Sequence, residues 1–339
     1  MKESNERRFD DAAEGVCEKI REHLRALPAG VKAQAQEIRL RVGRPVAIGC
    51  PGEIYFLRPG GGLAFLGGPE CVFAGKDDME ETFRILCGNS VYSHEAELRG
   101  GYVTLRGGHR AGICGTAVFQ NGEVSGIRDV SSVNIRVARE IPGCADAVLS
   151  RLGGLLGGGL LLAGPPSSGK TTILRDLARQ LASGAGRKIC KVAVVDERGE
   201  IAGTCRGVPQ NDVGLCCDVL DGCPKAQGIL TAVRTLSPQY VVCDEIGTEE
   251  EVRAVEQSLN AGVCVIASIH AGSAAELKRR RQVSELLRTG AFAAVAVLRG
   301  SGKPGEIAEI CRAGDLLAET GGGAAADRRG TSRGIYGIA

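Results

Sequence analysis

Apolar positions in the first 140 residues recur at helical spacing in some segments and at strand spacing in others. Residues 10–27 carry apolar side chains at helical spacing, which predicts an amphipathic helix that ends at Pro28. Apolar and arginine positions then alternate over 38–42, and the apolar pattern resumes at 46–48, as in a β-hairpin. A second helix is expected over 78–87.

Three short strand-like runs lie between residues 101 and 128, and the glycines between them predict an antiparallel meander. The segment Ile141-Pro142-Gly143 interrupts the pattern. We therefore expect a small α+β N-terminal domain over residues 1–140, with a role in oligomerisation or partner binding.

Beyond this boundary, apolar runs alternate with amphipathic helical segments, which is typical of an α/β domain. The runs GLLLAG, KVAVVD, YVVCDE and VCVIASI are apolar almost throughout, as expected for a mostly parallel sheet with helices on both faces. We expect this domain to span 141–315. The last segment, 316–339, has almost no apolar periodicity and is expected to be disordered.

Composition and charge argue against several classes of partner and site. Lys and Arg total 42 against 40 for Asp and Glu, so a formal charge of +2 gives no global attraction to nucleic acid. No apolar run approaches the roughly 18–20 residues of a spanning helix, so we expect a cytoplasmic chain without its own anchor. The 14 cysteines are interpreted as free thiols, and the cluster Cys216, Cys217 and Cys223 fits zinc-ligand spacing poorly.

The most specific motif begins at the end of the GLLLAG run. The sequence GPPSSGKT, residues 164–171, matches GxxxxGK[ST] between an apolar strand and an amphipathic helix, a context that a chance glycine-rich turn would lack. Backbone N–H groups of such a P-loop surround phosphate oxygens, and the helix N-terminus adds a positive dipole. Lys170 should neutralise the β- and γ-phosphates of ATP, and Thr171 should hold Mg²⁺. The expected nucleotide-binding residues are Gly164, Pro165, Pro166, Ser167, Ser168, Gly169, Lys170, Thr171 and Thr172.

An acidic pair, Asp244 and Glu245, follows the apolar run 240–243. The carboxyl ends of parallel strands are where α/β sheets bind ligands. We expect Asp244 to orient Mg²⁺ and Glu245 to polarise the attacking water. A further strand, 191–195, precedes this pair along the chain, and together with Glu245 it points to an ATPase with a catalytic glutamate. The sequence has no NKxD motif for guanine.

Polar residues next to other apolar runs are further candidates for catalysis. Glu197 and Glu200 follow one run, His270 follows another, and Arg234 precedes the run that ends in the acidic pair. We expect these residues to face the γ-phosphate, with His270 as a hydrogen-bond donor and Arg234 stabilising transition-state charge. Each of them has an ordinary alternative as a solvated or structural residue.

Two groups of basic residues have alternative interpretations. The arginines between residues 128 and 139 are either solvated side chains of a half-exposed strand or arginine fingers that complete a neighbouring subunit's site. The run 278–281, KRRR, is either a solvated helix face or a contact for a phosphate-rich partner.

Eight blocks in one order, between about residues 35 and 300, resemble the stage III sporulation protein AA family of endospore-forming bacteria. That family is itself similar to the hexameric traffic ATPases of type II and type IV secretion. The blocks are EIRLRVGRPV, VYSHEAELRGGYVTLRGGHRAGICG, SVNIRVARE, GPPSSGKTT, VVDERGEIAG, PQNDVG, DVLDGCPKAQG and VVCDEIG. The resemblance implies a RecA-like P-loop NTPase domain behind the smaller N-terminal domain.

The resemblance also implies a function. It suggests a homo-hexameric ATPase of the mother cell, peripheral to the inner face of the membrane. There it would energise a channel complex of membrane proteins between mother cell and forespore. No nucleic-acid partner is expected.

The resemblance also assigns residues. Gly164–Thr172 match the phosphate loop, Asp244 and Glu245 the Walker B pair, and His270 a histidine box. The likeness to the wider secretion group adds an acidic box and arginines from the N-terminal domain, namely Asp196, Glu197, Glu200, Arg136 and Arg139.

One departure from the family pattern keeps alternatives open. The family usually has Arg-Thr where this chain has Cys216-Cys217, so a charge expected near the active-site edge is missing. An ATP-dependent scaffold with little turnover is therefore one alternative. A nucleic-acid-stimulated ATPase that uses the run 278–281 is another.

Overall fold

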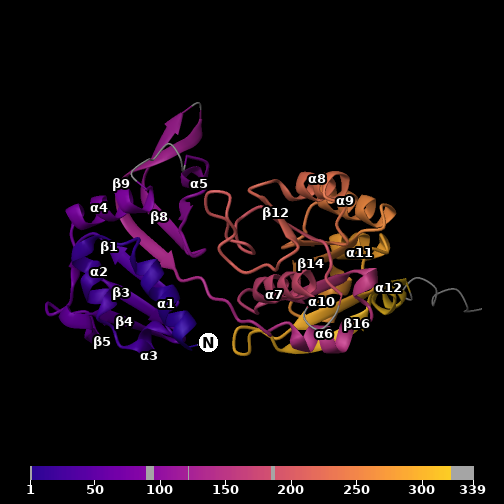
Figure 1. The fold of residues 1–339 in the computed structure, drawn as a ribbon, viewed down its shortest axis with the longest axis horizontal. Helices are drawn as coiled ribbons and strands as arrows, with labels where there is room; N and C mark the ends of the chain where they lie inside the picture. Colours follow the sequence, from indigo (N-terminus) through magenta and orange to yellow (C-terminus); the bar gives the residue numbers. More distant parts are fainter. Residues whose placement is uncertain (1, 89–94, 121, 185–187, 322–339) are drawn as a thin grey trace, which may run out of the picture. The chain divides into compact units, whose positions relative to one another are not determined.

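The structure is a computed structural model that describes residues 2–88, 95–120, 122–184 and 188–321. The chain forms two compact units, drawn in Figure 1. Unit 1 contains residues 1–141 and 202–212, and unit 2 contains 142–201 and 213–339. The main division lies next to the expected boundary at residue 140. The segment 202–212, expected in the second domain, belongs instead to unit 1.

Unit 1 is an antiparallel sheet in the order β5-β4-β3-β1-β9-β8-β7, together with a separate two-stranded pair, β2-β6. Its strands are β1 (Glu37–Arg41), β2 (Arg44–Pro45), β3 (Ala47–Cys50), β4 (Glu53–Leu57), β5 (Leu63–Ala64), β6 (Phe73–Ala74), β7 (Tyr102–Thr104), β8 (Arg110–Gln120) and β9 (Glu123–Arg136). Its helices are α1 (Lys2–Ala13), α2 (Glu18–Arg25), α3 (Ala29–Lys32), α4 (Lys76–Leu86) and α5 (Glu95–Arg99), with the 3-10 turn η1 (Pro59–Gly61).

The main core of unit 1 lies between this sheet and helices α1, α2 and α4. Ile38 and Leu40 of β1 are fully buried in it, whereas Arg41 is exposed, as the alternation predicts. The expected helix over 10–27 is wrong as a single helix, because the chain turns between α1 and α2. In that turn Gly15 packs so closely that an added Cβ would lie 3.0 Å from Leu86.

Unit 2 contains a sheet in the order β12-β11-β13-β14-β10-β15-β16. Neighbouring strands are parallel except for β15 and β16. The strands are β10 (Leu160–Gly164), β11 (Val192–Asp196), β12 (Cys217–Asp221), β13 (Tyr240–Cys243), β14 (Cys264–His270), β15 (Ala294–Leu298) and β16 (Ile307–Arg312). The helices are α6 (Asp146–Leu152), α7 (Lys170–Ser183), α8 (Lys225–Thr235), α9 (Glu249–Asn260), α10 (Ala274–Arg279), α11 (Arg281–Arg288) and α12 (Ala313–Gly321), with the 3-10 turn η3 (Leu156–Gly158).

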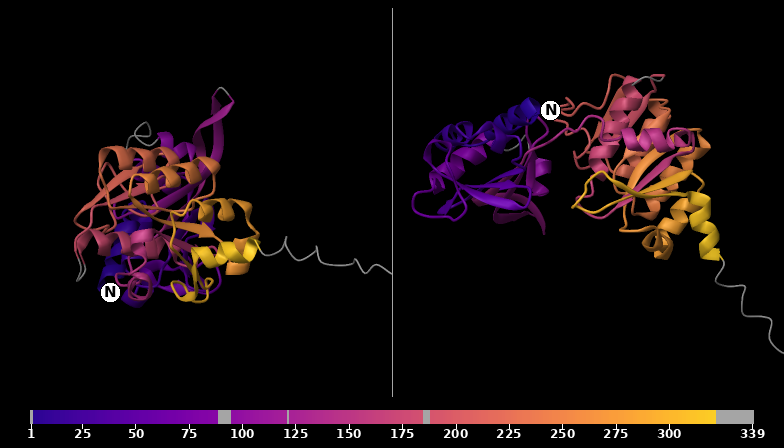
Figure 2. Two further views of the ribbon diagram at one scale, coloured as in Figure 1. Left: turned by 90° about the vertical axis from the view of Figure 1, so that its right-hand side faces the viewer. Right: turned by 90° about the horizontal axis from the view of Figure 1, so that it is seen from below.

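Helices cover both faces of the central strands of this sheet (Figures 1 and 2). Alternate strand residues such as Leu161 and Ala163 join one apolar cluster with residues of α8 to α12. Leu160 and Leu162 are also fully buried but lie outside that cluster, as do the apolar residues of α7. Burial on both sides explains why these strands are apolar throughout.

The end of the described chain differs from the expectation of disorder after residue 315. Helix α12 continues to Gly321, and Leu316 is buried in the core of unit 2 with an exposed fraction of 4%. The prediction is wrong for 316–321 because Leu316 and Leu317 pack inward against that core. The rest of the predicted tail, 322–339, lies outside the described residues.

Unit 1 contains a fully buried histidine, His109. Its Nδ1 accepts a hydrogen bond from the backbone N–H of Ala138 at 2.9 Å, which requires the unprotonated nitrogen. Burial, with a smaller contribution from the Arg8 guanidinium, lowers the pKa of His109 to about 3. The folded chain therefore holds this imidazole in its neutral form.

This burial predicts a pH dependence of stability. Below pH 6.5 the unfolded chain protonates His109, whereas the folded chain does so only near pH 3, so wild type loses stability as pH falls. Relative to His109→Gln, the unfolding free energy of wild type should fall by about 2–3 kcal/mol between pH 6 and pH 4. Urea unfolding of both proteins across this range measures the difference. A difference that stays constant with pH would contradict the buried neutral histidine.

Candidate functional site

The phosphate loop joins the end of β10 to the start of α7, and glycines stand at its two critical positions. Gly169 caps α7 with φ +91°, a left-handed conformation that favours glycine. An added Cβ on Gly164 would lie 2.5 Å from Oγ of Ser168 and 3.2 Å from Leu298. Gly169 is therefore required by its backbone conformation, and Gly164 by the lack of space for a side chain.

Lys170 is buried against this loop, and its Nζ donates to the carbonyls of Gly164 at 2.8 Å and Pro165 at 3.0 Å. Burial lowers the pKa of Lys170, although the carboxylates of Glu245 and Glu200 oppose that shift. Oγ of Ser168 is also buried and has no hydrogen-bond partner among the described residues. A cation and an unsatisfied hydroxyl inside a tight loop fit an anionic group such as a phosphate.

Strand pairing brings His270 to this loop. Strands β10 and β14 run parallel in a register that places His270 opposite Gly164. Nδ1 of His270 lies 3.4 Å from Nζ of Lys170, and its Nε2 lies 2.5 Å from Oε1 of Glu245. The structure thus connects Lys170, His270 and Glu245 in one chain of polar contacts.

Glu245 follows β13 and has an unusual backbone conformation, with φ +22°. Its N–H donates to Oγ of Ser268 at 3.0 Å, one strand away in β14. A strained residue of this kind persists only where its surroundings hold it. Ser268 is not among the residues expected from the sequence, although a polar residue within an apolar strand was a usable signal.

Asp244 lies beside Glu245 and is 3% exposed. Burial raises the pKa of Asp244 to about 6, while the ammonium of Lys225, 3.8 Å away, acts in the opposite direction. Burial also disfavours the charged form of Lys225, but carboxylates led by Glu251 and Asp244 outweigh burial and raise the pKa of Lys225. Lys225 is not among the residues expected from the sequence. Its signal was a lysine at a helix start, where the helix dipole disfavours a cation.

The Mg²⁺ expected with ATP would be held by the Thr171 hydroxyl and the Asp244 carboxylate. Mg²⁺ in nucleotide sites takes one or two protein oxygens and completes its shell with phosphates and water. Thr171 lies in the first turn of α7, and Asp244 directly follows β13, so both belong to the same edge of the sheet. In the described part of the chain, no group of three or more His, Cys, Asp or Glu side chains could hold a metal ion alone.

The acidic turn after β11 is anchored to α7. Buried Asp196 accepts from the N–H groups of Glu200 and Ile201, at 2.8 and 3.2 Å. Arg175 of α7 donates to the carbonyls of the same two residues at 2.6 and 2.7 Å. Glu197 lies 3.6 Å from Lys225. These contacts place Glu197 and Glu200 at the sheet edge that carries Asp244.

Comparison with known sequences identifies the family of this chain. The family described as "Sporulation stage III, protein AA" matches residues 10–315. The chain belongs to this family. Stage III sporulation protein AA of Bacillus subtilis (strain 168) is 37% identical over 316 residues, which cover 93% of this chain and 99% of that protein. An uncharacterised protein, ycf45 of Porphyra purpurea, is 28% identical over 187 residues, covering 53% of this chain and 31% of that protein.

Solved structures confirm the expected fold. The Legionella pneumophila ATPase DotB aligns with TM-score 0.51 at 14% identity, over 83% of this chain and 75% of that one. The pilus retraction motor PilT, solved with bound ADP, aligns with TM-score 0.50 at 18% identity, over 78% and 74%. This member of the sporulation family therefore has a RecA-like P-loop domain preceded by an N-terminal domain. Within the described residues, no helix combines the length and apolar character needed to cross a bilayer.

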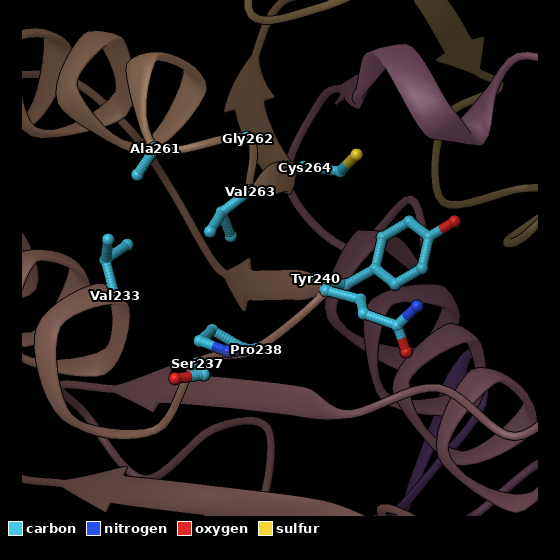
Figure 3. A pocket seen from close by; sticks show the side chains of 9 residues that line it. Val233, Ser237, Pro238, Tyr240, Ala261, Gly262, Val263 and Cys264 are labelled. Carbon is cyan, nitrogen blue, oxygen red and sulfur yellow. The ribbon is translucent and has the colours of Figure 1, made fainter.

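The structure corrects the expectation that Arg234 faces the γ-phosphate. Arg234 is exposed in the last turn of α8, before β13 begins, and the P-loop lies at the opposite, carboxyl ends of these parallel strands. An open hollow of about 390 Å³ lies at those strand starts, and its lining includes the neighbouring Val233 and Cys264 (Figure 3). Arg234 therefore lies at the edge of the sheet opposite the phosphate loop.

Cys216-Cys217 also lie away from the phosphate edge, contrary to the expectation from the family pattern. Cys217 pairs with Val192 at the start of the strands, whereas Asp221, at the other end of β12, pairs with Asp196. The family's usual arginine would therefore be distant from the phosphate edge, and its replacement removes no charge from the site.

The arginines of unit 1 differ from one another. Arg139 is half-buried, and its Nη2 donates to the carbonyl of Ala35 at 2.6 Å in its own unit. Arg136 is exposed at the end of β9 and stays a candidate for completing a neighbouring subunit's site.

The basic run 278–281 is not one helix face, because it spans the end of α10 and the start of α11. In it Arg280 donates to the His270 carbonyl.

The loop geometry predicts a cost for a side chain at Gly169. In Gly169→Ala the Cβ would lie 2.9 Å from the backbone nitrogen of Gly305, in a left-handed conformation, so we expect a loss of about 1–3 kcal/mol in unfolding free energy. Gly157→Ala is the matched control, since its Cβ would meet nothing within 4 Å, and its effect should stay within about 0.5 kcal/mol. Urea unfolding measures both. Equal effects would refute this description of the loop.

Proposed function

We propose that this chain binds ATP with Mg²⁺ in the loop of residues 164–171 and hydrolyses it. The observation that carries the proposal is the chain of contacts from Lys170 through His270 to Glu245, next to buried Asp244. A phosphate-binding cation, a carboxylate for the attacking water and a metal-binding carboxylate are the parts that phosphoryl transfer to water requires.

Each residue has a distinct role in this proposal. Lys170 exchanges the carbonyls of Gly164 and Pro165 for phosphate oxygens when ATP binds. Glu245 orients and polarises the attacking water. His270, which contacts both, couples the position of the carboxylate to the presence of phosphate. When bound with the nucleotide, Mg²⁺ supplies positive charge for the phosphates and would be held by Thr171 and Asp244.

The proposal also concerns where the ATPase works and which process it serves. We infer that the ATPase works as a homo-hexamer in the mother cell, peripheral to the inner face of the membrane. There it energises a channel complex of membrane proteins between mother cell and forespore. Membership of the sporulation family and the fold shared with the ATPase DotB and the pilus retraction motor PilT support this setting. Exposed Arg136 is the residue of unit 1 that we expect to complete a neighbouring site.

Lys170→Ala tests nucleotide use. Loss of the ammonium removes the charge that faces the phosphates, so ATP turnover should fall by about 10²-fold or more. Steady-state phosphate release measures the change, and Lys76→Ala, an exposed lysine of unit 1, is the control that should match wild type. Turnover that survives in Lys170→Ala would locate the hydrolysis elsewhere.

Glu245→Gln separates turnover from binding. The amide cannot accept a proton from water, so turnover should fall by about 10²–10⁴-fold while ATP stays bound. Rapid filtration with radiolabelled ATP, run alongside phosphate release, reports both quantities. An unchanged rate would eliminate the assigned role of Glu245. A wild type that binds ATP but releases no phosphate would favour the alternative of an ATP-dependent scaffold.

A further inference from the structure

A lysine is buried at the start of α8 where physical chemistry disfavours it. Lys225 is 7% exposed and is the first residue of that helix, directly after Pro224. A cation in the first turn of a helix opposes the helix dipole, and burial removes its hydration. Specific contacts around Lys225 must offset both unfavourable contributions to the folding free energy.

Lys225 contacts four acidic residues through its Nζ. It donates to the backbone carbonyl of Glu245 at 2.8 Å. Carboxylate oxygens of Glu251, Glu197 and Asp244 lie 3.4, 3.6 and 3.8 Å away. These residues come from α9, the turn after β11 and the end of β13. One ammonium therefore balances carboxylates from three segments of the site.

The contact with the Glu245 carbonyl is the most specific of these. Glu245 has the strained φ of +22°, and its two backbone polar groups are both bonded: the N–H to Ser268 and the carbonyl to Lys225. These two bonds fix the peptide groups on either side of the residue. They thereby fix the direction in which its side chain leaves the backbone toward His270.

Glu251 extends this support to the rest of the turn. Its Oε2 accepts from the N–H groups of Gly247 and Thr248 at 2.7 and 2.9 Å, closing the capping box of α9. Its Oε1 faces Lys225. Lys225 is thus attached to the turn that carries Glu245 at the carbonyl of Glu245 and, through Glu251, at residues 247–248.

We propose that Lys225 is a positioning residue for ATP hydrolysis, which holds the strained backbone of Glu245 so that its carboxylate points at the attacking water. This inference rests on the proposed function. It predicts a defect in the chemical step rather than in nucleotide binding, because Lys225 contacts the water-activating turn, and its Nζ bonds none of the described residues of the phosphate loop.

The test compares steady-state ATP hydrolysis by the full chain in wild type, K225M, K225R and the double variant K225M/E251Q. In K225M we expect kcat to fall by about 10²-fold, with KM for ATP within about threefold of wild type. The kcat of K225R should exceed that of K225M by about tenfold or more, because a guanidinium retains the charge and can donate to the same carbonyl. K76M is the matched control, since Lys76 also opens a helix but its side chain is 73% exposed, and its kcat should equal that of wild type.

The double variant distinguishes two roles for Lys225: positioning the Glu245 backbone, or only neutralising the nearby carboxylates. E251Q removes one of the carboxylates that K225M leaves unbalanced, so K225M/E251Q should regain stability in urea unfolding while its kcat stays low. If K225M does not fold, this double variant and K225R carry the test.

Three outcomes would overturn the inference while wild type still hydrolyses ATP. They are an unchanged kcat in K225M, a kcat restored together with stability in the double variant, and an equal loss of kcat in K76M. A wild type without ATP hydrolysis would overturn the proposed function itself, and the inference with it.

Discussion

Strand β10 pairs with β14 in a parallel register that sets Gly164 opposite His270. Side chains alternate between the faces of a strand, so a slip of one residue would reverse the direction of every side chain in β14. The observed register brings His270 within reach of Lys170, and the parallel pairing of β13 with β14 places Ser268 beside Glu245. Because β14 lies between β10 and β13, the loop of residues 164–171 and the carboxylates of Asp244 and Glu245 share one edge of the sheet.

Several groups at this edge reduce the stability of unit 2, and contacts from other elements must compensate for them. Asp244 is buried as a carboxylate, Lys225 is buried as an ammonium, and Glu245 has a strained backbone. Each group is supported by another element: α8 provides Lys225, β14 provides Ser268, and the apolar cluster around α8 to α12 keeps these elements in place. Stability and the proposed chemistry therefore depend on the same contacts.

The sequence predicted the features that depend on local pattern. The phosphate motif between an apolar strand and a helix located Lys170, and the apolar runs predicted the parallel sheet. The errors share another cause, since Arg234 and Cys216-Cys217 lie at the starts of parallel strands, at the sheet edge opposite the phosphate loop. Lys225 was overlooked because it takes its importance from residues that only tertiary packing brings together.

A crystal structure of the chain with Mg²⁺ and a non-hydrolysable ATP analogue tests the central claim most directly. The account predicts phosphates in the loop of residues 164–171, with Nζ of Lys170 moved from the carbonyls of Gly164 and Pro165 to phosphate oxygens. It also predicts Mg²⁺ between the Thr171 hydroxyl and the Asp244 carboxylate. An analogue bound elsewhere, with Lys170 still on those two carbonyls, would contradict it.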